Sequence, residues 1–242
     1  MHRLVTELRN QNWITVVLEL VVVVVGIFLG LQADAWNEAR NDRIRERAHL
    51  EQIYADAVFN SEQLAQKAEH HAELADGLIF TIGVVKRGEI RPDEVERFKW
   101  AILTMLQYPP AAINTGGYDT LIASGDFSVL RDSELRSRLV RMHSYFETIS
   151  QRIVALTGGQ QRELPFSSNV AYAIPHPSGK GILWRVDYEL LRDDRGTLAN
   201  LASERRNHAI VQDIYAEGAR ESGDLKEYVD RLVGKEKAPM SE

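Results

Sequence analysis

Residues 14–31 form an 18-residue run in which only Thr15, Glu19 and two glycines interrupt bulky apolar side chains. A run of this length and composition meets the threshold for a transmembrane helix. Trp13 and Trp36 flank it at the depth where tryptophan meets lipid headgroups. We therefore expect a permanent anchor and not a removable signal peptide.

One side of this helix is small and polar. At ~100° per residue, Glu19, Gly26, Gly30, Ala33 and Asn37 project within one narrow arc, and we call these five residues the span face. Two glycines four residues apart let two helices approach closely, and a carboxylate at this depth favours a hydrogen-bond donor over lipid. The span face therefore predicts self-association or packing on a partner helix. The alternative is that the glycines are incidental and that Glu19 reaches the interface with its carboxylate.

After Trp36 the chain keeps a helical pattern, with no glycine or proline before Gly77. Apolar residues recur at steps of three and four, as in an amphipathic helix or a coiled coil. This stripe predicts a helix that is both a stalk and a bundle member, and we expect it to continue the intermolecular contact of the span. Its members are Leu50, Ile53, Ala57, Asn60, Leu64, Ala68, His71, Ala75, Leu78, Ile82 and Val85. The polar members Asn60 and His71 are expected to fix register or to face solvent, and not to bind a ligand.

The fold class predicted is all-α: a single N-terminal transmembrane helix that continues into a long helix, followed by a bundle of about four to six helices. Gly88 and Gly125 are expected helix stops, and Asp132 an N-cap. The predicted segments are an N-terminal tail (1–12), the transmembrane helix (13–36), a long stalk helix (37–88), a helical hairpin and bundle (89–159), a proline-rich loop (160–184), C-terminal helices (185–234) and a disordered tail (235–242).

Within the C-terminal part, residues 197–217 and 224–233 are predicted as separate helices, and residues 182–186 either as a short strand or as packing on the bundle. A loop as long as 160–184 is either a partner-binding segment or a tolerated surface excursion.

Composition excludes several classes of function. The net charge of -6 and a pI near 5.7 argue against nucleic acid, because no basic block with interleaved aromatics is present. The absence of cysteine excludes disulfides, iron-sulfur clusters and thiolate zinc sites.

Four arginines between 40 and 47 favour a cytoplasmic domain by the positive-inside rule. They alternate with acidic residues, however, and long domains translocate largely regardless of charge. We expect a bacterial inner-membrane protein whose soluble domain lies in the periplasm.

Two segments resemble a widespread family of uncharacterised bacterial single-span membrane proteins. The first runs from Glu19 through Gly26-Ile-Phe-Leu-Gly30 to Trp36-Asn37-Glu38. The second contains Tyr118, Leu121, Ser124 and Gly125, followed by Leu130 and Glu134-Leu135-Arg136. The resemblance extends from the span to about Ile153 and implies a membrane-tethered helical domain. It implies no reaction, ligand or catalytic residue.

The sequence lacks the patterns of common active sites. The segment 178–181 (Ser-Gly-Lys-Gly) lacks the other residues of a phosphate-binding loop. Glu46 and His49 have the spacing of a di-iron ligand pair, but no second copy is present. We therefore expect no enzyme, no cofactor and no metal; a metal-dependent enzyme, the least favoured alternative, would use Glu46, His49 or His71.

The favoured function is a membrane-anchored helical scaffold, accessory or regulatory protein. Its partners are the lipid bilayer and either further copies of itself or a partner membrane protein. The alternative is an ion- or proton-conducting oligomer lined by a ring of Glu19 carboxylates.

Overall fold

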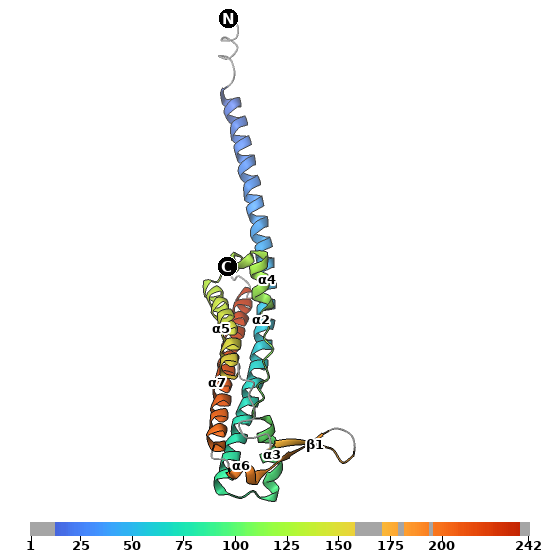
Figure 1. The fold of residues 1–242 in the computed structure, drawn as a ribbon. Coiled ribbons are helices and arrows are strands. Elements are labelled where there is room, and N and C mark those ends of the chain that lie inside the picture. Colours follow the sequence, from blue (N-terminus) through green and yellow to red (C-terminus); the bar gives the residue numbers. More distant parts are fainter. Residues whose placement is uncertain (1–12, 158–170, 179–181, 194–195, 238–242) are drawn as a thin grey trace.

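The fold is organised around one helix that runs from the apolar segment into the soluble domain without interruption. The computed structural model describes residues 13–157, 171–178, 182–193 and 196–237. Helix α2 spans Trp13–Arg87, 75 residues, which corresponds to about 110 Å at 1.5 Å per residue. Figure 1 shows its first half projecting alone from the bundle and its second half packed inside it. The prediction that the span continues into a long helix is confirmed.

The projecting half of α2 has the properties of a membrane span. Near the N-terminus it is long and apolar enough to cross a membrane, and none of that apolar window is buried inside the protein. Every residue from Val16 to Glu38 is exposed. The aliphatic side chains that would otherwise need a protein core are thus available to lipid.

Further helices complete the bundle. They are η1 (Pro92–Glu94), α3 (Val95–Thr104), α4 (Gly116–Ser124), η2 (Asp126–Ser128), α5 (Ser133–Thr157), α6 (Tyr188–Asp193) and α7 (Thr197–Lys237). Gly125 ends α4 in the left-handed region, with φ of 74°. Asp132 accepts a hydrogen bond from the backbone N–H of Leu135 at 2.7 Å and caps α5. The predicted stop at Gly125 and cap at Asp132 are confirmed.

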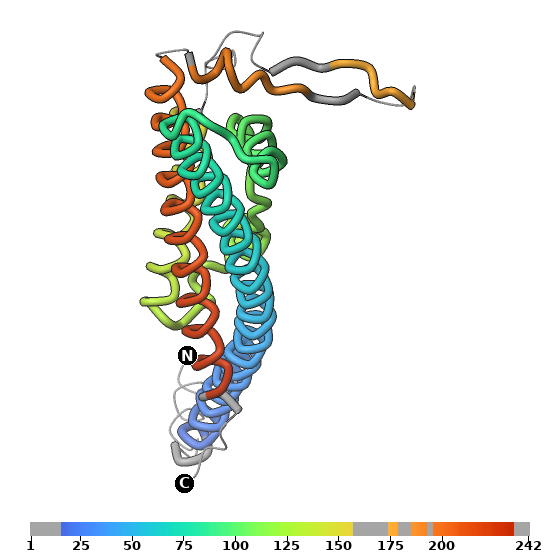
Figure 2. Tube along the Cα trace, turned by 90° about the horizontal axis from the view of Figure 1, so that it is seen from below, coloured from blue at the N-terminus to red at the C-terminus, as the bar shows by residue number. Residues whose placement is uncertain are grey.

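The hydrophobic stripe of α2 is buried by other helices of the same chain. Helix α7 returns alongside α2, as Figures 1 and 2 show, and α5 packs on the pair. The buried stripe residues include Leu50, Ile53, Ala57, Leu64, Ala68, Leu78 and Val85. They belong to three apolar clusters stacked along the helix, each shared with α7. The expectation that this stripe continues an intermolecular contact is therefore wrong, because α7 already covers it.

Part of the predicted proline-rich loop is a β-hairpin. Strand β1 (Ala171–Pro175) pairs antiparallel with β2 (Ile182–Val186), with Ala173 opposite Trp184. It projects sideways from the bundle in Figure 1. The β-branched and aromatic residues of 182–186 stabilise a strand, and Pro175 is tolerated because it ends the edge strand. The prediction of a loop is wrong for β1, whereas the short strand at 182–186, one of the two predicted alternatives, is confirmed; residues 160–170 and 179–181 lie outside the described part.

Helix α7 is one continuous element of 41 residues and not two helices. It passes through Gly218, where an added Cβ would lie 3.1 Å from Leu64 Cδ1. The lack of a side chain at this glycine lets α7 approach α2 closely, so the prediction of two helices is wrong. The helix also includes residues 235–237, so the predicted disordered tail does not begin at 235; residues 238–242 lie outside the described part.

Candidate functional site

The span face is present as one continuous, uncovered surface of α2. Glu19, Gly26, Gly30, Ala33 and Asn37 are all exposed. A Cβ built on either glycine would meet no atom within 4 Å. No described part of the same chain therefore fills the space beside the two glycines, and what packs there stays a prediction.

The membrane-proximal end of the bundle is fastened to α2 by two acidic contacts. Glu46 accepts a hydrogen bond from the backbone N–H of Arg131 at 2.7 Å, and its side chain is buried. His49 Nε2 lies 3.0 Å from Asp126 Oδ2. Hydrogen bonding from His49, with the nearby charge of Arg45, lowers the pKa of the Asp126 carboxyl below its usual range. These contacts lock the η2 turn and the start of α5 against α2.

This geometry separates the residues that the metal alternative would need. Glu46 is engaged with Arg131, His49 with Asp126, and His71 with His208 on α7. Among the residues that the structure describes, no three His, Cys, Asp or Glu side chains converge as metal ligands.

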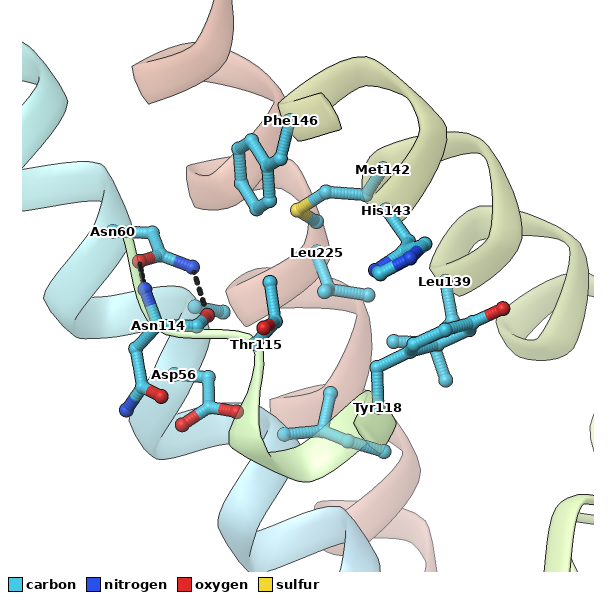
Figure 3. Close-up of a pocket in the computed structure, with 12 residues that line it drawn as sticks. Asp56, Asn60, Asn114, Thr115, Tyr118, Leu139, Met142, His143, Phe146 and Leu225 are labelled. Atoms are coloured by element: carbon cyan, nitrogen blue, oxygen red, sulfur yellow. Dashed lines mark hydrogen bonds between the residues drawn. The ribbon is translucent and has the colours of Figure 1, made fainter. Parts of the chain in front are cut away.

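A small cavity lies where α2 meets the segment leading into α4. Its volume is about 30 Å³, room for roughly two water molecules. Figure 3 shows Asn60 reaching the backbone of Asn114 through both ends of its amide. Nδ2 donates to the Asn114 carbonyl and Oδ1 accepts from the Asn114 N–H, each at 2.7 Å. The amide thus replaces two backbone hydrogen bonds that this irregular segment lacks.

The same cavity wall anchors the first turn of α4. The Asp56 carboxylate accepts from the backbone N–H of Gly117 at 2.6 Å, at a helix N-terminus where negative charge is favourable. Tyr118 then stacks on His143 of α5 with ring centroids 4.2 Å apart. Asn60 and Asp56 are thus engaged with the backbone of their own chain, which gives this wall of the cavity a structural role, while the buried Nδ1 of His143 has no hydrogen-bond partner among the described residues.

The most buried polar contact joins α2 to α7. His71 Nδ1 lies 2.9 Å from His208 Nδ1, and both residues are fully buried. His208 Nε2 lies 2.9 Å from the Met105 carbonyl, which only accepts, so this nitrogen carries a proton. Neutral His208 therefore accepts at Nδ1, and His71 Nδ1 donates. His71 Nε2 is then an acceptor, and it is buried with no hydrogen-bond partner.

Aromatic rings enclose this histidine pair. Tyr108 stacks on His208 with centroids 4.4 Å apart, and its hydroxyl donates to Glu204 at 2.8 Å. Tyr215 stacks on His71 at 5.7 Å. Burial, reinforced by the neighbouring His208, lowers the pKa of His71 to about 3. His71 is thus neutral at ordinary pH.

Sequence reasoning placed His71 in the core but missed its partner. The signal was available in α7, where Glu204 and His208 occur four residues apart and so share a helix face. This spacing does not match the di-iron motif. It does allow two polar side chains on one helix to face the same part of the core.

Comparison with protein-family models, with curated proteins and with solved structures finds no match. The geometry itself defines a class: a helical bundle built on one helix that is long and apolar enough to cross a membrane.

Proposed function

We propose that the protein is a membrane-anchored helical scaffold, accessory or regulatory protein that associates through its span. The observation that carries this proposal is the span face, which is uncovered and lies on the same continuous helix as the bundle. Small residues at this spacing favour close helix packing in lipid, where the hydrophobic effect does not drive association.

The location that goes with this function is the bacterial inner membrane, with the N-terminus in the cytoplasm and the bundle in the periplasm. An uninterrupted helix between span and bundle supports a role in which the domain is presented at a fixed position. Accessibility of single introduced cysteines to an impermeant thiol reagent in whole cells tests the orientation, because the native chain has no cysteine.

The test of association is the native mass of the full-length protein in nanodiscs. We expect a defined oligomer that the double substitution Gly26→Leu and Gly30→Leu converts to monomer, because leucine side chains keep the helices apart. The matched control is Val21→Leu with Val25→Leu, which has the same spacing on the opposite side of the helix. An assembly unchanged by the glycine substitutions contradicts the proposal. A mass of five or more subunits would favour the Glu19 ring.

A further inference from the structure

The outer side of α2 carries a second, uncovered pattern that continues the span face beyond the membrane. The side that faces α7 uses the buried stripe, and the opposite side points to solvent. Along it lie Asn41, Ile44, Ala48, Ala55 and Phe59, all exposed. At ~100° per residue they fall within about 40° of the arc that holds the span face. We call these five residues the stalk face.

The stalk face includes large apolar side chains that no described part of the chain covers. Ile44 is 60% exposed and Phe59 is 41% exposed. Ile44 precedes the first buried residue of the bundle, so its exposure is not a by-product of a gap in the core. Beyond Phe59 the same side of the helix carries exposed Glu62, Glu69 and Glu73. The apolar pattern thus has a defined end.

The spacing of these residues is regular. From Gly26 to Ala48 the face residues follow steps of four and three. Glu51 and Gln52 occupy the next positions, after which Ala55 and Phe59 resume the pattern. Face residues recur every 11 positions, as in Ala33, Ile44 and Ala55, or Asn37, Ala48 and Phe59. An 11-residue repeat favours a right-handed supercoil of two helices. Two glycines four residues apart favour a right-handed crossing within the membrane. The span and the stalk therefore both favour a right-handed arrangement of the two helices.

The two edges of the face carry complementary charges of both signs. Asp34 and Arg45 lie about 60° to 80° from the centre on one edge, and Arg40 and Glu51 lie about 40° to 60° away on the other. In a parallel pair related by a two-fold axis, the first edge of one helix meets the second edge of its neighbour. Asp34 then lies near Arg40 of the neighbour. Asn37 and Asn41 are self-complementary, since an amide both donates and accepts.

We infer that the span and stalk faces together form the interface with a second copy of this chain, packed parallel from Gly26 to Phe59. This inference rests on the proposed self-association of the span and extends it to the solvent-exposed part of α2. The bilayer holds two copies parallel and at equal depth, so equivalent residues of the two helices lie at the same height and can contact each other.

Single-cysteine cross-linking of the full-length protein in nanodiscs tests the inference, because the native chain contains no cysteine. Disulfides form only where Cα atoms approach within about 7 Å. We expect oxidation to yield covalent dimers at least fivefold faster for Ile44→Cys, Ala48→Cys and Ala55→Cys than for the exposed controls Arg43→Cys and Arg47→Cys, which point about 80° to 120° away from the face.

Ala33→Cys, at the membrane end of the span face, separates the two proposals. Cross-linking at 33 without cross-linking at 44, 48 and 55 overturns the extended interface and leaves association of the span intact. No cross-linking at any position, with a monomeric native mass, overturns both. Equal rates at face and control positions also overturn the inference, because they indicate random collision. Circular dichroism of each variant verifies that the helical fold is retained.

Discussion

His71 on α2 and His208 on α7 meet through their Nδ1 atoms at 2.9 Å, although 137 residues separate them in sequence. The contact fixes the relative height of the two longest helices, because both rings are fully buried and neither can slide without breaking it. It also makes the stability of the bundle depend on pH.

The pKa of His71 is about 3 in the folded protein, against 6.5 ordinarily. Between these values the unfolded chain binds a proton that the folded chain excludes. Stability is therefore greatest above pH 6.5 and falls as the pH decreases, by up to about 1.4 kcal/mol per pH unit from this group. Urea unfolding between pH 7.5 and 4 measures the slope. His71→Gln should reduce it, while His70→Gln on the same helix should not; equal slopes in both variants would contradict this assignment.

Asn60 is expected to contribute more to stability than its neighbour in the cavity wall. Asn60→Ala removes two hydrogen bonds and leaves the backbone of Asn114 without them, which should cost about 2–3 kcal/mol. Asn114→Ala keeps that backbone pair and loses a single exposed bond to Gly116, so about 1 kcal/mol or less is expected. Equal losses of unfolding free energy in urea would show that the amide bridge is unimportant.

Two glycines should respond to alanine with opposite signs. Gly125 has φ of 74°, a conformation that costs a residue with a Cβ about 1–2 kcal/mol. Gly223 lies inside α7 and has open space around its Cβ position. Gly223→Ala should therefore stabilise by about 0.5–1 kcal/mol. Thermal unfolding of the two variants beside the wild type measures both changes in stability. A Gly125→Ala variant more stable than the wild type would contradict the expected cost at Gly125.

Glu19 is not expected to line a conducting pore. Close packing at Gly26 and Gly30 leaves no lumen for water between the helices. Ion flux into liposomes containing the wild type should match that of empty liposomes, and Glu19→Gln should not alter it. Flux that Glu19→Gln abolishes would replace the scaffold with the channel.

The local features of the fold were predictable from the sequence because their causes are local. A glycine in the αL conformation ends a helix through its own backbone. Asp132 caps α5 by accepting a hydrogen bond from the first turn of that helix. The apolar run and the stripe predicted the continuous helix α2 for the same reason.

The errors concern which segment packs against a buried surface. Periodicity shows that Leu64 is buried but does not show whether α7 or another chain covers it. The coiled-coil interpretation wrongly assigned this contact to another chain. The prediction of separate helices over 197–217 and 224–233 is wrong because Gly218 lies inside α7, where its lack of a side chain lets α7 approach α2. The pairing of His71 with His208 depends on this same approach and was therefore beyond a local pattern.

Helix α2 has no glycine-proline hinge or loop between the span and the bundle, so the two parts share one rotational setting. A turn of the bundle about its long axis must turn the span by the same angle, and a contact made in lipid must orient the bundle and its projecting hairpin. If the span associates as proposed, the direction in which the bundle faces is determined by a contact inside the membrane.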